Sequence, residues 1–139
     1  MGAVPWLRRT GLLAAGREVT EDDVALLRGV REAVRALLLH NTGGPAPAES
    51  DLAPLHSVSS RGAARMDVGA DGGIGLTVVG DSVADRLLEL LIVIRDAQRD
   101  GTWVHLKTCA NPECRWAFYD RSRNRGGTWC SMATCGNKV

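Results

Sequence analysis

The 139-residue sequence predicts an α+β fold, with a helix-rich N-terminal part that contains a β-hairpin, followed by a small four-cysteine module. Three observations predict it. Two long segments carry apolar residues at helical spacing, a glycine-rich turn separates two short β-like segments, and all four cysteines lie between positions 109 and 135. Apolar residues make up 45% of the chain and charged residues 24%, which is typical of globular proteins and argues against a disordered chain.

The first predicted helix follows Thr20, which is placed to cap it together with Asp23. Apolar residues at intervals of three and four then form one stripe, until Asn41 and the Gly-Gly-Pro run stop the helix. The stripe comprises Val24, Leu27, Val30, Val34, Leu37 and Leu38. A shorter helix is predicted over residues 50–59, where Pro54 has to lie in the first turn. Its inward residues are Leu52, Leu55 and Val58.

Two strands are predicted over residues 63–69 and 74–79, joined by the glycine-rich turn. A second long helix is predicted from Ser82, with Asp85 three residues later, and ends at Gly101. Its buried side comprises Val83, Leu87, Leu90, Leu91, Ile94 and Ala97. We expect the two long helices and the hairpin to close one small α+β core.

The cysteines follow the spacing C-x4-C-x15-C-x4-C. They are Cys109, Cys114, Cys130 and Cys135. Two close pairs joined by a hairpin-length spacer provide four thiolates with little loop entropy, so we predict one structural zinc ion. Strands are predicted over residues 104–108 and 116–119, with a polar turn over 120–127. An iron–sulfur cluster is the alternative, but the spacings differ from the ferredoxin patterns.

Three strings in this segment resemble the CGNR zinc finger: residues 109–114, residues 119–124 and the stretch 129–138, which contains Cys-Gly-Asn-Lys. Lys138 stands where the family has arginine, which preserves the charge. The resemblance covers about residues 101–139, the predicted C-terminal domain. A zinc knuckle and a hairpin whose second cysteine pair opens a helix form a treble-clef-like module, in which the helix is the natural element to enter a DNA groove.

The N-terminal part is similar to the ABATE domain, which such fingers usually follow in bacterial proteins regarded as stress-induced transcription regulators. The similarity lies in Trp6–Leu13 and in the helix that starts after Thr20. It implies an ABATE-like domain over residues 1–100. Family members usually carry an earlier segment and continue past the finger into a basic helix, whereas this sequence stops four residues after Cys135.

The net charge of +1 hides an uneven distribution, because residues 101–139 hold six bases and two acids (+4) whereas residues 1–100 hold eleven bases and fourteen acids (−3). The finger therefore has candidates for nucleic-acid contact, above all for phosphate contact. They are Arg115, Arg121, Arg123, Asn124, Arg125 and Lys138. Zinc held by four thiolates carries a net charge of −2, so neutralisation of the metal site is the alternative role for some of these bases.

These features predict a transcription regulator that binds DNA through its finger, with an N-terminal domain that senses a small-molecule ligand or forms a homodimer. A protein-interaction adaptor with a purely structural zinc site and a zinc-thiolate redox sensor are the alternatives. None of the three histidines lies beside a nucleophile and a carboxylate at a catalytic spacing, so we predict no enzyme and no catalytic residues.

The remaining expectations concern location and the tryptophans. The longest apolar runs fall far short of the roughly 20 residues of a membrane helix, and no secretory signal is recognisable, so we expect no membrane partner and a cytoplasmic location. We expect Trp103, Trp116 and Trp129 to pack in a small core rather than stack on bases.

Overall fold

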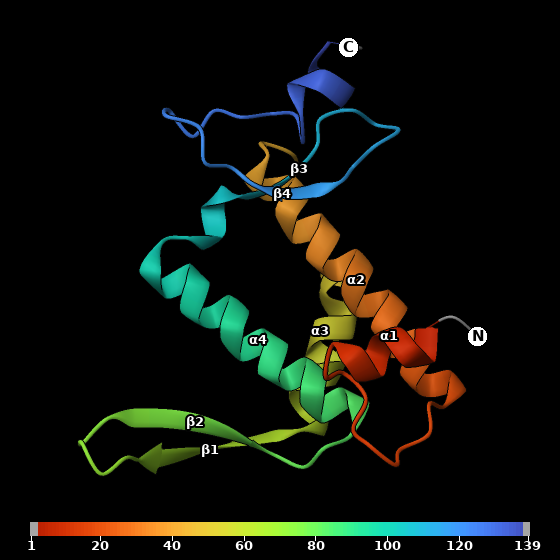
Figure 1. The fold of residues 1–139 in the computed structure, drawn as a ribbon, viewed down its shortest axis with the longest axis vertical. Coiled ribbons are helices and arrows are strands. Elements are labelled where there is room, and N and C mark those ends of the chain that lie inside the picture. Colours follow the sequence, from red (N-terminus) through yellow and green to blue (C-terminus); the bar gives the residue numbers. More distant parts are fainter. Residues whose placement is uncertain (1–2, 138–139) are drawn as a thin grey trace. The chain divides into compact units, whose positions relative to one another are not determined.

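The computed structural model describes residues 3–137 and confirms the α+β class, with helices and two separate antiparallel hairpins (Figure 1). The elements are α1 (Ala3–Arg9), α2 (Glu21–Asn41), α3 (Glu49–Arg61), β1 (Ala63–Val68), β2 (Ile74–Val79), α4 (Val83–Asp100), the 3-10 turn η1 (Trp103–His105), β3 (Leu106–Thr108), β4 (Ala117–Tyr119) and the π-helical turn η2 (Met132–Gly136). The chain divides into two compact units. The first comprises the residues up to Val30 and Ala53–Val93, and the second Arg31–Leu52 and the residues from Ile94 onward. The domain boundary at residue 100 stays a prediction.

In the first unit, α2 and α4 start at the predicted caps. The backbone N–H of Asp23 donates to the Thr20 hydroxyl over 3.1 Å, and the N–H of Thr20 donates to the Asp23 carboxylate over 3.0 Å. Ser82 and Asp85 repeat this exchange at the start of α4. Each pair satisfies two N–H groups that have no partner within the helix, which is why both starts were predictable from sequence.

Two other helices differ from expectation. Helix α1, which buries Leu7, was not predicted from the sequence. Helix α3 begins at Glu49 and ends at Arg61, so Pro54 lies in the second turn rather than the first. The start is earlier because the Asp51 carboxylate accepts a hydrogen bond from the N–H of Ala48 over 2.9 Å, which caps the helix before Glu49.

The hairpin of β1 and β2 has the predicted bounds to within one residue, and its register runs from Ala63 opposite Val79 to Val68 opposite Ile74. Its turn uses Gly72 at φ +81°, a conformation that suits glycine. The expectation that it closes the core is wrong, because all six β1 residues are exposed and no β2 residue is buried. The core of this unit comes from helices and loops: Leu7, Leu13, Leu26, Val30, Val58, Val83 and Leu87.

In the second unit, side chains at the C-terminal end of α2 are hydrogen-bonded to the segment that contains η1 and β3. The side-chain amide of Asn41 donates to the carbonyls of Trp103 and Leu106, each over 2.9 Å. The hydroxyl of Thr42 accepts a hydrogen bond from the N–H of Thr108 over 3.0 Å. The strand predicted over residues 104–108 is consequently shorter, because the chain makes the turn η1 where Asn41 binds both carbonyls, and only Leu106–Thr108 pairs with β4.

Candidate metal centre and nucleic-acid surface

The four cysteines come together from two turns of the second unit. Their sulfur atoms all lie within 4.8 Å of one another. The Cys114 and Cys130 sulfurs are 3.6 Å apart, and those of Cys130 and Cys135 are 3.7 Å apart. Tetrahedral zinc with zinc–sulfur bonds of about 2.3 Å places its ligands about 3.8 Å apart, whereas a disulfide needs about 2 Å. The cluster therefore fits a four-thiolate zinc ion.

Backbone hydrogen bonds hold the two turns that carry the cysteines. The N–H of Cys109 donates to the carbonyl of Trp116 over 2.8 Å, which extends the β3–β4 pairing, and Cys114 closes a turn on the carbonyl of Asn111 over 3.0 Å. Arg115 follows at φ +50°, which turns the chain back toward β4. Ser131 caps the second turn by accepting the N–H of Ala133 over 3.2 Å. These contacts help to position the cysteines relative to one another.

The pKa values of the Cys109 and Cys130 thiols are shifted in opposite directions. Burial raises the pKa of Cys109, but hydrogen bonds from the backbone N–H groups of Cys130 and Asn111 outweigh it and lower this pKa to about 7. Burial and the neighbouring thiol of Cys114 raise the pKa of Cys130 to about 12. Four thiolates cannot share this volume without a cation, and a coordinated metal deprotonates its thiols. The donor set therefore fits a divalent metal that accepts soft thiolate ligands, such as zinc.

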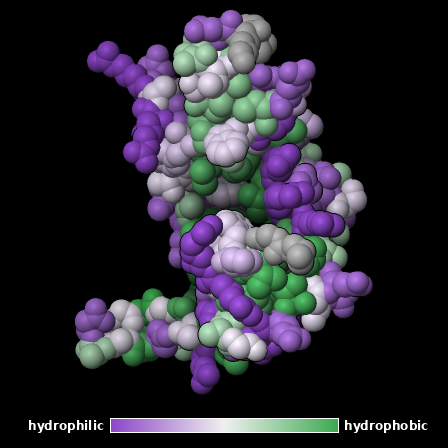
Figure 2. Space-filling view, turned by 45° about the vertical axis from the view of Figure 1, so that its right-hand side comes forward, coloured by the Kyte–Doolittle hydropathy of each residue, from purple (hydrophilic) through white to green (hydrophobic). Residues whose placement is uncertain are grey.

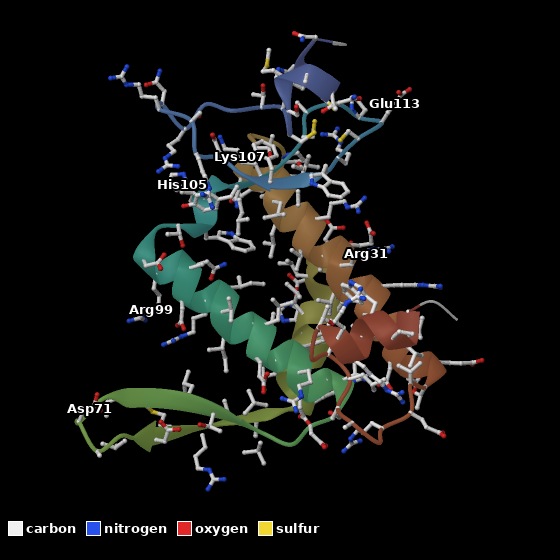
Figure 3. The ribbon with its side chains drawn as sticks, in the orientation of Figure 1. Arg31, Asp71, Arg99, His105, Lys107 and Glu113 are labelled. Carbon is white, nitrogen blue, oxygen red and sulfur yellow. The ribbon has the colours of Figure 1, made fainter. Side chains whose placement is uncertain are left out.

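A buried ion pair, which was not predicted from the sequence, lies under the loop over residues 120–127. The ammonium of Lys107, a residue that is labelled in Figure 3, donates to the Asp120 carboxylate over 2.8 Å and to the carbonyl of Arg125 over 2.7 Å. The N–H of Gly127 donates to the same Asp120 oxygen as Lys107 over 2.9 Å, and the N–H of Ser122 donates to the other oxygen over 3.0 Å. These bonds, that of Lys107 first, hold the pKa of Asp120 well below its usual range.

The candidate nucleic-acid residues divide into two groups. Arg121, Arg123 and Asn124 are exposed on the loop, and the guanidinium of Arg121 lies 5.6 Å from the centre of the Tyr119 ring. Arg115 is half-buried and donates to the carbonyl of Cys109 over 3.4 Å. Arg125 is exposed as well, but its side chain donates to the carbonyl of Asp120 over 2.5 Å. The last candidate, Lys138, lies outside the described residues.

The tryptophans differ from one another. Trp103 is buried, as expected, and Trp129 is half-buried. Trp116 is 69% exposed, so the expectation that it packs in a core is wrong. It directly precedes the short strand β4, and a three-residue hairpin has too little surface to cover so large a side chain.

The site and the fold define the class: a small α+β protein with a four-cysteine zinc finger. Two family models match the chain. Residues 105–139 match the CGNR zinc finger, and residues 2–99 match the ABATE family, described as "Putative stress-induced transcription regulator". The chain belongs to the ABATE family and carries a CGNR zinc finger, which supports one structural zinc ion as its cofactor.

Neither family description is that of an enzyme. No curated protein matches the chain. Among the described residues, no helix has both the length and the apolar character that a membrane crossing requires.

Proposed function

We propose that the chain is a DNA-binding transcription regulator whose finger contacts the phosphate backbone through the loop over residues 120–127, while Cys109, Cys114, Cys130 and Cys135 hold the zinc. The observation that carries this proposal is the Lys107–Asp120 pair beneath the loop. The pair neutralises the acidic residue of the loop internally, and Arg121 and Arg123, two positions apart in sequence, are exposed. The Arg121 guanidinium lies over the Tyr119 ring, and a group that is already held in place loses less entropy on binding phosphate.

The placement of the other bases refines their roles. Arg115 and Arg125 donate to backbone carbonyls. We therefore assign Arg115 mainly to holding the turn that begins at Cys109, and Arg125 mainly to holding the loop over residues 120–127. Asn124 is exposed next to Arg123 and is the candidate for a base-edge contact. Lys138 stays a candidate for phosphate contact. For the N-terminal domain we propose ligand sensing or dimerisation, and for the protein a cytoplasmic location.

Binding of a short DNA duplex, measured by fluorescence anisotropy at several salt concentrations, tests the proposal. We expect the Arg121→Ala plus Arg123→Ala variant to bind more weakly and to lose about 2 units of the slope of log affinity against log salt. The matched control is Arg28→Ala plus Arg99→Ala, which removes two exposed helix arginines. Absence of DNA binding by the zinc-loaded chain at low salt, or an unchanged slope in the loop variant, contradicts the proposal.

A second candidate is the protein-interaction adaptor, which the exposed apolar side chains of the second unit favour. Trp116 is 69%, Met132 60% and Val104 55% exposed. Exposed aromatic and methionine side chains are typical anchors of protein interfaces. If Trp116→Ala abolishes capture of a partner protein while the loop variant does not, and DNA binding is absent, the adaptor is the correct function.

A further inference from the structure

The hairpin of β1 and β2 has one apolar and one polar face. Side chains alternate between the faces of a strand, so the register sorts the residues into two sets. One set is entirely apolar: Ala64, Met66, Val68, Ile74, Leu76 and Val78. The other carries Arg65 and Asp67, and the hydroxyl of Thr77 donates to the Asp67 carboxylate. Met66 is 68% and Val68 72% exposed, and Figure 2 shows hydrophobic surface on the protruding hairpin at the lower left.

The outer edge of β1 is also free. Its sheet contains β2 as the other strand, and no further backbone hydrogen bond within residues 3–137 reaches Ala63–Val68. An isolated two-stranded hairpin is marginally stable at best, and independent stability needs three or more strands with a hydrophobic face or packing against a helix. Free N–H and C=O groups along an edge strand template pairing with another chain.

We infer that β1 pairs antiparallel with β1 of a second copy of this chain, about a two-fold axis at Met66. The inference rests on the dimerising role proposed for the N-terminal domain and names its surface. In an antiparallel pair, directly opposed residues point to the same face of the sheet. In a pair of identical strands, the two-fold axis therefore passes between one residue and the same residue of the other copy. An axis at Met66 opposes Arg65 of each copy to Asp67 of the other. An axis at Arg65 or at Asp67 instead opposes like charges, which destabilises the pair.

The available side chains support this register. The Arg65 side chain has no hydrogen-bond or ion-pair partner within the described residues, so its charge is free to meet an acid. On the apolar face, the register opposes Met66 to Met66 and Ala64 to Val68, so no charge is buried there. The product is a four-stranded sheet in the order β2-β1-β1-β2. The outer edge of β2 is a poorer choice, because it has no charged residue to select a register and carries Gly75 in its interior.

Charge exchange in the full zinc-loaded chain tests the pairing, with the dissociation constant measured by analytical ultracentrifugation. We expect Arg65→Asp alone and Asp67→Arg alone each to weaken dimerisation about tenfold or more, because each turns two attractive pairs into repulsive ones. The double variant exchanges the charges and restores the wild-type dissociation constant to within a few-fold. Arg28→Asp, an exposed helix position, is the matched control and leaves the dimer unchanged.

A thiol cross-linker with a short span tests the register itself. Antiparallel neighbours have Cα atoms about 4.5–5.5 Å apart, so Met66→Cys is expected to cross-link the two copies. Val68→Cys is the matched control, since Val68 lies opposite Ala64 and about 14 Å along the strand from its own copy. Zinc content is measured before and after, to show that the finger cysteines did not react.

A monomer at every accessible concentration overturns the inference, as does a dimer that is insensitive to the charge variants or that cross-links equally through Val68→Cys. The latter result indicates face-to-face packing or another surface. DNA binding is measured separately on the same samples. A monomer that binds DNA contradicts this inference alone, and a charge-sensitive dimer that does not bind DNA contradicts the proposed function alone.

Discussion

The two hairpins of this chain are stabilised in opposite ways. The pair β1–β2 is the longer, with six residues in each strand, yet it buries none of its side chains. The pair β3–β4 has three residues in each strand, and both Lys107 and Thr108 are buried in it. The shorter hairpin is held by a buried ion pair, by Thr42 and by the cysteine cluster.

The comparison teaches that strand length and β-propensity do not decide which hairpin is anchored. The longer strands have favourable residues and a good turn, which favour local pairing but bury no side chain. The shorter strands need groups from elsewhere in the chain, namely Asn41, Thr42 and the cysteines. Removal of those groups should therefore affect one hairpin and leave the other intact.

The largest effect is expected from loss of the metal. Cys109→Ser plus Cys135→Ser should abolish zinc binding and unfold β3–β4, because zinc binding supplies about 10–16 kcal/mol in small zinc domains. Zinc-to-chain ratio and amide hydrogen exchange measure this, with protection lost at Thr108 and kept in α4. Met132→Ser, an exposed change between the same cysteines, is the control. Retained protection of β3–β4 in the zinc-free variant would show that the metal is not its main support.

The next effect concerns the buried ion pair. Lys107→Met leaves the Asp120 carboxylate buried without a counter-charge and should lower the melting temperature by about 10 °C. Lys107→Met plus Asp120→Asn should recover part of this loss, while Arg123→Met, at an exposed position, should change it little. An unchanged melting temperature in Lys107→Met would mean that the pair does not stabilise the loop.

The ion pair also predicts a pH dependence. The pKa of Asp120 is lowered in the folded chain from 3.8, chiefly by Lys107. Its contribution to stability is therefore complete above about pH 5 and is lost progressively as the pH falls through the unfolded value toward the lower folded value. The difference in melting temperature between the wild type and Lys107→Met should be constant from pH 8 to pH 5 and shrink on further acidification, with zinc retention checked at each pH.

A smaller effect is expected at the exposed pair of Arg17 and Asp81, which joins the α1–α2 loop to the β2–α4 loop over 2.9 Å. The hydrogen bond and charge of Arg17 lower the pKa of Asp81. Arg17→Ala should lower the melting temperature by about 2 °C, and 1 M salt should remove the difference, because exposed pairs are screened. A difference that persists at high salt would show that packing, rather than charge, is responsible.

The smallest effect is expected on the exposed hairpin. Met66→Ala should change the free energy of unfolding by less than about 0.5 kcal/mol when measured below the concentration at which the chain dimerises. Leu87→Ala, at a position 2% exposed, should cost about 2–5 kcal/mol and is the matched control. Equal costs at the two positions would show that Met66 is covered within the single chain.

Local signals predicted much of the fold and of the metal site. The capping pairs of α2 and α4, their apolar stripes and the glycine-rich turn all lie within a few residues, so short-range physics is enough to recognise them. The spacing of the four cysteines likewise predicts their clustering, which the structure confirms. By contrast, α1 has no cap signal strong enough to predict it, and the start of α3 depends on Asp51 capping from inside the helix.

By itself, the sequence determined the fold class, the four-cysteine cluster and the family to which the chain belongs, because each depends on residue types at short, regular spacings. The tertiary structure alone decided that Asn41 bends the chain before β3, that Lys107 neutralises Asp120, and that the longer hairpin lies in solvent. These features join residues far apart in sequence or depend on burial. Periodicity records which face of an element is apolar, but not whether anything covers it.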